Sequence, residues 1–175
     1  ALSQAMRRVA AIAVVHDTLS EGLSQNVDFD VVLERVLMLV AEVASAGTTV
    51  VKPTTTGSVG ILPSEYATPL ALVLTELVTN AVEHGLRGKA GGKVDIDSRR
   101  SDDALIISVT DNGGGLDHGK LGDGLGTQIV RTLVDGELGG SIAWNDQSTG
   151  GTEVRIAIPL QFLAPLDSPV ALPSV

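Results

Sequence analysis

The chain has 175 residues, and with 21 Asp and Glu against 12 Lys and Arg its formal net charge is −9. This length fits one domain with short extensions. No cluster of basic residues offers the positive face that nucleic acids and anionic membranes require, so we expect no direct binding to nucleic acid. Because the chain has no cysteine, disulfide scaffolds, thiolate nucleophiles and Cys-ligated metal sites are excluded. Of its 20 glycines, 12 lie between Gly113 and Gly151.

The first residues are typical of an amphipathic helix. Over residues 1–20, apolar or small residues recur three or four positions apart, the heptad seam of a helix that packs on another helix. The seam comprises Leu2, Ala5, Val9, Ile12, His16 and Leu19. We therefore expect His16 to be a packed or interfacial residue. A second helical pattern opens at Asp28 or Asp30 and runs to about Ser45.

The middle of the chain predicts strands on either side of one long helix. Short β-branched and aliphatic runs at residues 48–52 and 58–62, bounded by Gly and Pro, predict two strands joined by a turn. Start signals at Pro63 and Ser64 open a helix that ends at Gly85. Residues 93–99 and 104–110 then alternate well enough for two strands joined by a turn.

The last part of the chain predicts a glycine-rich loop over residues 111–126, a helix over 127–138 and strands at 141–145 and 152–159. From residue 161 the composition becomes Pro-rich without periodicity. The order of the elements predicts an α+β layer sandwich preceded by a remnant of a helical hairpin. We expect the hairpin remnant in residues 1–25, the folded domain in residues 26–160 and a Pro-rich tail in residues 161–175.

The long helix carries the first candidate site. Glu76, Asn80 and His84 recur four residues apart, so they should stack in one column beside the apolar stripe. A carboxylate, an amide oxygen and an imidazole in a row can hold a hard, partly hydrated cation and position a nucleophile or a phosphate. A polar face exposed to solvent is the alternative.

Two further motifs flank strands. Asp111 ends an apolar strand and precedes Asn112 and three glycines, which let a backbone come close to a ligand. Its carboxylate can accept a hydrogen bond from the exocyclic amine of a purine, and a plain turn is the alternative. Thr152 follows Gly150 and Gly151 and can reach a base or a bridging water, although this pair alone is typical of a hairpin turn.

The remaining motif leads directly into a helix. It consists of Gly122, Gly124, Leu125, Gly126 and Thr127. The free N–H groups and the positive end of the helix dipole at this point favour phosphate. The motif is neither a P-loop nor a Rossmann fingerprint, so it belongs to neither common nucleotide fold.

Together and in this order, the four motifs resemble the N, G1, G2 and G3 boxes of the Bergerat-fold ATPases, the superfamily of gyrase B, Hsp90, MutL and the histidine kinases. The resemblance covers about residues 48–160. It implies a sandwich with a mixed sheet of about five strands covered by about three helices. It also implies an ATP site with Mg²⁺ on Asn80 and adenine on Asp111. The other ATP-binding residues implied are His84, Gly113, Gly115, Gly122, Gly124, Leu125, Gly126, Thr127 and Thr152.

Residues 7–20 are similar to the second dimerisation-and-phosphoacceptor helix of sensor kinases of the HisKA_2 group. This resemblance implies a cytoplasmic domain that transfers the γ-phosphoryl group of ATP to a histidine and then to an aspartate of a response regulator. Glu76 would orient the nucleophile or accept its proton. The partners implied are the phosphoacceptor helix, in cis or in trans, a response regulator of the RNA-binding antiterminator type, and a second copy through the N-terminal helix.

The chain departs from the group in two ways. Only residues 116–121 separate the second and third motifs, which leaves His118 and Lys120 as the nearby side chains that can touch phosphate. The group's acceptor box, of the type His-Arg-Val-Lys-Asn-Asn, does not occur here, so we expect the chain to begin after it. His16 lies in the apolar seam and is not assigned as the acceptor.

Three alternatives belong to the same superfamily. An anti-sigma-factor-type serine kinase shares the long-helix motif, but the heptad pattern of residues 1–20 argues against it. A GHL-type ATPase, in which Glu76 would activate water, generally carries a longer lid. A non-catalytic signalling module would not need Asn80, Asp111 and the glycines to be intact.

The missing acceptor box leads to a first prediction. The chain should bind Mg·ATP without phosphorylating itself, so incubation with γ-labelled ATP should leave it unlabelled. Stable label on His16 would contradict this expectation.

Overall fold

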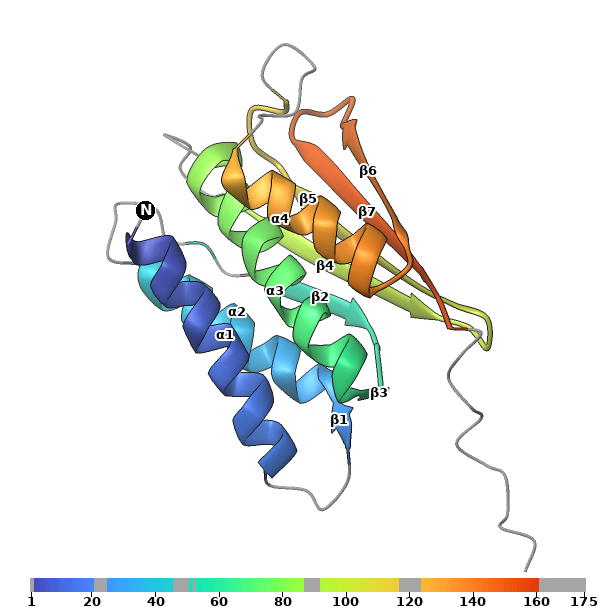
Figure 1. Ribbon diagram of the computed structural model, residues 1–175. Coiled ribbons are helices and arrows are strands. Elements are labelled where there is room, and N and C mark those ends of the chain that lie inside the picture. Colours follow the sequence, from blue (N-terminus) through green and yellow to red (C-terminus); the bar gives the residue numbers. More distant parts are fainter. Residues whose placement is uncertain are drawn as a thin grey trace, which may run out of the picture.

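A layer of helices lies on one side of a five-stranded sheet in the computed structural model (Figure 1). The structure describes residues 2–20, 25–45, 51, 53–86, 92–116 and 124–160. Across these ranges no helix combines the length and the apolar character needed to cross a membrane. The elements are α1 (Leu2–Ser20), β1 (Asn26–Asp28), α2 (Phe29–Ser45), β2 (Thr54–Gly57), β3 (Ile61–Pro63), α3 (Ser64–Asn80), β4 (Val94–Arg100), β5 (Ala104–Asp111), α4 (Leu125–Thr132), β6 (Ser141–Asp146) and β7 (Thr152–Pro159). Two π-helical turns, η1 (Ala81–Gly85) and η2 (Leu133–Glu137), continue α3 and α4.

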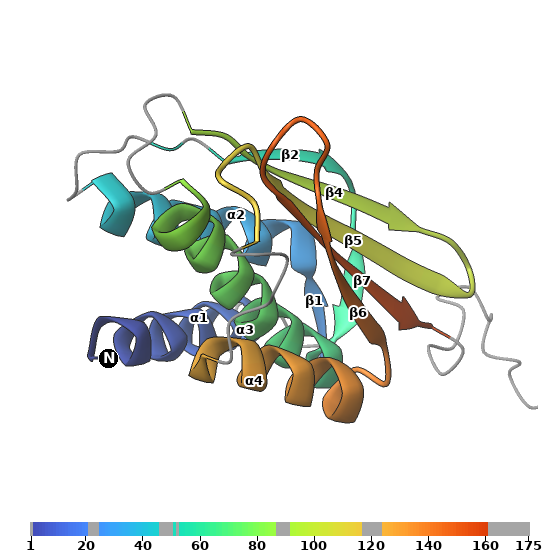
Figure 2. The ribbon, with the colours of Figure 1, turned by 90° about the horizontal axis from the view of Figure 1, so that it is seen from above.

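The large sheet has the strand order β2-β4-β5-β7-β6. β2 runs parallel to β4, whereas the other neighbours are antiparallel, so the sheet is mixed. Alternate residues of β5 and β7 are buried, because the helices cover one face of the sheet and leave the other uncovered (Figure 2). The predicted α+β sandwich with a mixed sheet is confirmed. β1 and β3 form a separate two-stranded antiparallel sheet.

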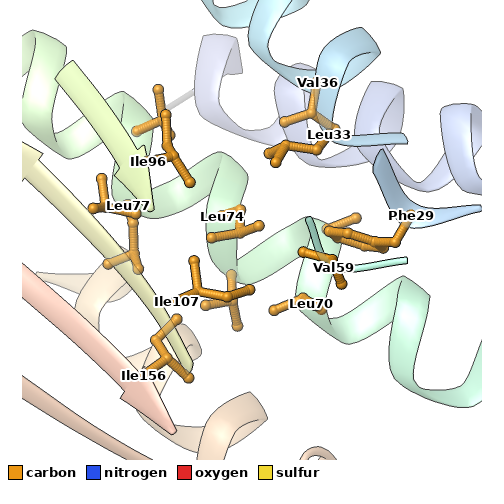
Figure 3. Close-up of a cluster of buried hydrophobic side chains, with 14 of the residues drawn as sticks. Phe29, Leu33, Val36, Val59, Leu70, Leu74, Leu77, Ile96, Ile107 and Ile156 are labelled. Carbon is orange, nitrogen blue, oxygen red and sulfur yellow. The ribbon is translucent and has the colours of Figure 1, made fainter. Parts of the chain in front are cut away.

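α3 is the central helix of the core. Leu70 and Leu74 are fully buried and Leu77 is nearly so. Figure 3 shows these side chains between isoleucines of the sheet and the apolar residues of α2. The labelled neighbours are Phe29, Leu33, Val36, Val59, Ile96, Ile107 and Ile156. Each buried Leu or Ile contributes roughly 1.5–3 kcal/mol, so α3 is held firmly from two sides.

The helices and most strands lie where the sequence predicts them, and the strand predicted at residues 58–62 is present in part as β3, but the turn predicted before it is wrong. The structure has β2 at Thr54–Gly57, inside the predicted turn, and β3 pairs with β1. Residues 48–50 and 52 lie outside the described ranges. β2 consists of exposed polar residues and glycine, so its sequence has no apolar pattern that predicts a strand. Side-chain hydrogen bonds join it to β4: the hydroxyl of Thr54 donates to Asp95 and that of Thr56 to Asp97.

α1 contacts α2 and α3 through a face other than the predicted heptad seam. Val9 is 66% exposed and Ile12 46% exposed, whereas Ala11 is buried. His16, expected to be packed, is exposed instead. Among the seam residues whose side chains the structure describes, all are exposed, so α1 packs with Ala11 inward instead.

Asp30, in the first turn of α2, links this helix to the segment before β3. Its Oδ1 accepts the N–H of Val59 at 2.8 Å, and its Oδ2 accepts the N–H of Gly60 at 3.1 Å and the hydroxyl of Ser58. Burial raises the pKa of Asp30, but these hydrogen bonds and the charge of Arg100 outweigh burial and lower the pKa below its ordinary value. The ionised carboxylate therefore stabilises the fold.

Replacing this carboxylate should weaken the fold in a pH-dependent way. Asp30→Asn should lower the free energy of unfolding by about 2 kcal/mol at pH 7, because charged hydrogen bonds are lost. Since the folded pKa is lowered, the contribution is present above the unfolded pKa and is lost as the pH falls through the folded pKa, below about 4. Urea unfolding at pH 7, 5 and 3.5 measures this difference.

Asp102→Asn, in the exposed turn between β4 and β5, is the matched control and should be neutral. An equal loss for Asp30→Asn at every pH would contradict the assignment.

Candidate functional site

Asp111 lies at the end of β5 with 6% of its surface exposed. Its Oδ1 accepts the N–H of Gly113 at 2.8 Å, which fixes the direction of the carboxylate. The end of η1 lies against the same group: a Cβ added to Gly85 would be 2.8 Å from that oxygen. The carboxylate is therefore enclosed by backbone from two segments.

Three segments meet around Asp111 with no room for side chains between them. A Cβ on Gly113 would lie 1.8 Å from the carbonyl oxygen of Gly85, and one on Gly151 would lie 1.9 Å from the carbonyl oxygen of Asp111. Gly151 also has φ +99°, a conformation that L-residues rarely adopt. Gly114 donates its N–H to the carbonyl of Gly85 at 3.0 Å. The glycines thus allow the end of η1, the loop after β5 and the turn before β7 to touch.

Two side chains hold the loop after β5 in place. Asn112 accepts the N–H of Lys93 through its side-chain oxygen at 2.8 Å. Asp146, at the end of β6, accepts the N–H of Leu116 at 2.7 Å. The sequence analysis missed Asp146, because its partner is 30 residues away. An acidic residue at the end of a strand does not by itself indicate that it holds a loop.

A second group of polar atoms lies where α4 begins. Glu76 is only 3% exposed although it is an acid. A Cβ on Gly126 would lie 2.7 Å from Oε2 of Glu76 and 3.9 Å from Oδ1 of Asn80. The first turn of α4 therefore rests directly on these two residues of α3.

The start of α4 can receive an anion. Gly124 precedes the helix in an extended conformation, and along the described chain no side chain caps this end of α4. The first N–H groups of a helix have no partner within the helix, and they carry the positive end of its dipole. This end therefore suits phosphate or carboxylate.

Glu76 has a partner that the sequence analysis missed. Arg8 of α1 donates from Nε to Oε1 of Glu76 at 2.6 Å and from Nη2 to Oε2 at 3.1 Å. The hydrogen bond to Glu76 raises the pKa of Arg8 above its ordinary value; partial burial opposes this effect and the charge of the carboxylate adds to it. Arg8 was not among the residues of the predicted heptad seam, and the packing of α1 through a different face brings it against Glu76.

The structure separates the three residues predicted to stack in one column. Glu76 is buried, Asn80 is half-buried and His84 is exposed. In η1 the N–H of Leu86 donates to the carbonyl of Ala81, five residues back, at 3.0 Å. This wider turn interrupts the four-residue repeat after Asn80 and rotates His84 away from the column.

The other predicted residues divide between the two groups. Thr152 is buried at the start of β7, next to Gly151, whereas Gly115, with φ +79°, lies beside Asp146. In α4, Thr127 is half-buried and Leu125 is 63% exposed. Gly122, His118 and Lys120 lie outside the described residues.

The two groups lie along one helix. Gly85 lies five residues after Asn80 on the same helical segment, so the group at Glu76 and Asn80 lies about one turn from the group at Asp111. An elongated ligand with an amine-bearing ring at one end and an anionic group at the other fits this spacing. In the described ranges no three acidic or His side chains gather to hold a metal ion by themselves.

The chain is similar to known proteins of one family. Residues 65–162 match the family model of histidine kinase-, DNA gyrase B-, and HSP90-like ATPases. The chain is 42% identical over 164 residues to the sensor histidine kinase PdtaS of Mycolicibacterium smegmatis, covering 91% of this chain and 33% of that protein. PdtaS of Mycobacterium tuberculosis is also 42% identical, with 32% of its length covered. The chain thus spans about a third of these relatives.

A solved structure shares the fold. The histidine kinase domain of a blue-light-activated histidine kinase of Erythrobacter litoralis superposes with a TM-score of 0.79 at 26% sequence identity. The match covers 90% of this chain and 75% of that one.

The close backbone approach around Asp111 can be tested with neighbouring glycines. Gly113→Ala should lower the free energy of unfolding by about 2 kcal/mol or more, because the new Cβ would overlap the carbonyl of Gly85. Gly114→Ala is the matched control: nothing lies within 4 Å of its Cβ position, so its effect should stay within about 0.5 kcal/mol. Urea unfolding compares the two, and equal effects would contradict the geometry.

Proposed function

Because the chain belongs to the family of histidine kinase-, DNA gyrase B- and HSP90-like ATPases, we propose that its two groups of polar atoms are the two ends of a site for Mg·ATP. One observation carries this proposal. Gly85, Gly113 and Gly151 close around Asp111, while Gly126 brings the start of α4 onto Glu76 and Asn80. These residues lie in or beside the four sequence motifs that resemble the boxes of this superfamily.

The adenine is proposed to bind at Asp111. A buried carboxylate with a fixed direction can accept a hydrogen bond from the exocyclic amine of the base, and it rejects bases that present an acceptor there. Oδ1 is held by the N–H of Gly113, so the carboxylate needs little reorganisation when a base binds. Thr152, buried beside Gly151, supports this contact.

The phosphates are proposed to bind at the start of α4, with Gly122, Gly124, Gly126 and Thr127 around them. The uncapped N–H groups of the helix supply the attraction. The side-chain oxygen of Asn80 is a hard donor of the kind that Mg²⁺ accepts, together with phosphate oxygens and water. A single protein ligand suits Mg²⁺, which keeps most of its shell from substrate and solvent.

The proposed reaction is that of a protein histidine kinase. Bound ATP supplies the γ-phosphoryl group. A histidine nitrogen of the phosphoacceptor helix, acting in cis or in trans, forms the new bond to phosphorus as the bond to the ADP oxygen breaks. Glu76 would orient this imidazole or take its proton. The resemblance of most of the chain to sensor histidine kinases favours this reaction over that of an anti-sigma-factor-type serine kinase.

The wider context follows from the same relationship. A response-regulator aspartate would receive the phosphoryl group, and we propose a regulator of the RNA-binding antiterminator type. Residues 26–160 would form the catalytic domain, working in the cytoplasm. The apolar residues that α1 exposes, Val9 and Ile12 among them, are consistent with a homodimer through this helix.

Nucleotide binding should depend on both ends of the site. Asn80→Ala and Asp111→Asn should each weaken binding of Mg·ATP at least about tenfold, because a buried polar contact to the ligand is lost in each. Asp111→Asn keeps the shape of the side chain but presents an amide to the adenine amine. Isothermal titration calorimetry measures the affinities, and circular dichroism verifies the fold.

The matched controls are Asn145→Ala and Asp102→Asn, both at exposed positions outside the site. They should bind as the wild type does. Wild-type affinity in both Asn80→Ala and Asp111→Asn would refute the assignment.

A further inference from the structure

The ion pair between Arg8 and Glu76 joins two elements that lie 68 residues apart in the sequence. Both carboxylate oxygens of Glu76 accept from the guanidinium, at 2.6 Å and 3.1 Å. The exposed fraction of the side chain is 20% for Arg8 and 4% for Glu76. This bidentate ion pair is among the stronger side-chain interactions, and it fixes both the orientation of the two side chains and the distance between them.

Without Arg8, the carboxylate of Glu76 would be a buried, uncompensated negative charge. It lies against Gly126, beside the first N–H groups of α4. Any anion bound at that helix end would meet this charge at short range, where little water screens it. Arg8 cancels the charge, so its presence decides how favourable this end of the site is for a polyanion.

Arg8 comes from a helix that packs against α3 and α2. Among the described side chains of α1, Ala11 alone is fully buried, whereas Met6, Val9 and Ile12 are exposed. The ion pair adds a polar contact to this packing, and its geometry depends on where α1 lies. A shift of α1 would withdraw the guanidinium and leave Glu76 unpaired.

We propose that Arg8 is a positioning residue of the nucleotide site: it holds the Glu76 carboxylate in place, cancels its charge beside the start of α4, and thereby makes nucleotide binding depend on the docking of α1. This inference rests on the proposed function, since it takes the phosphates to lie at that helix end. By linkage, the coupling works in both directions. Bound Mg·ATP should hold α1 more tightly to the domain.

The test compares four variants of the 175-residue chain by calorimetric titration with Mg·ATP. Arg8→Ala should weaken binding about tenfold, within the usual range of coupling between sites. Arg8→Lys keeps the charge but loses the second hydrogen bond to Glu76, so affinity for Mg·ATP should fall less than in Arg8→Ala. Arg8→Ala combined with Glu76→Gln removes both charges and should restore affinity to within about threefold of the wild type. Arg99→Ala, at the far end of β4 from Asp111, removes a positive charge elsewhere and should change nothing.

Hydrogen exchange of the α1 amides provides a readout other than binding. Mg·ATP should slow this exchange in the wild type. It should not do so in the double variant, in which affinity is restored but the ion pair between α1 and α3 is absent. A purely structural role of Arg8 would lower the unfolding midpoint without making affinity depend on the charge of residue 76.

The outcomes separate the two proposals. If the wild type does not bind Mg·ATP, the proposed function fails, and this inference fails with it. If the wild type binds and Arg8→Ala binds equally well, or if the double variant is no better than Arg8→Ala, the proposed function stands and the role of Arg8 is refuted.

Discussion

The burial of α3 on two sides is the constraint on which the rest of the structure depends. Its leucines pack against the sheet on one side and against α2 on the other (Figure 3), so the helix can neither rotate nor slide without opening the core. Glu76 and Asn80 therefore have fixed directions, and the end of η1 is carried to Asp111. The packed core fixes the backbone of the site, and local hydrogen bonds then fix its polar side chains, as Arg8 does for Glu76 and Gly113 for Asp111.

The same constraint explains how an acidic chain can offer a site for a polyanion. The chain has a net charge of −9 and no basic cluster in its sequence. Attraction for an anionic ligand therefore has to come from oriented backbone N–H groups and a helix end. Such groups act only at short range, which requires backbone to approach ligand without side chains between them. Glycines at positions 113, 126 and 151 let the segments around the site pack directly on one another, without side chains between them. Their role is close contact more than flexibility.

The sequence predicted those features that depend on local pattern. The long helix ending at Gly85 and the strands β4, β5, β6 and β7 were found because their periodicity is local. β2 was misplaced because Asp side chains of β4 stabilise its threonines, a contact between distant segments. The prediction that Glu76, Asn80 and His84 form one column assumed an unbroken α-helix, but the π-helical turn η1 interrupts the helix after Asn80. Gly85 was interpreted as a helix stop, whereas in the structure its missing side chain also admits Asp111.

Arg8 was the hardest feature to predict, because it depends on how α1 is rotated against its neighbours. The seam with the larger apolar residues would face inward if burial area alone decided the packing. In the structure the described seam residues Val9 and Ile12 are exposed, whereas the smaller Ala11 is buried and the arginine contacts Glu76. An ion pair with a buried partner can outweigh a few exposed methyl groups, because an unpaired buried carboxylate is costly. The rotation of α1 and the charge beside the start of α4 are therefore linked through one ion pair.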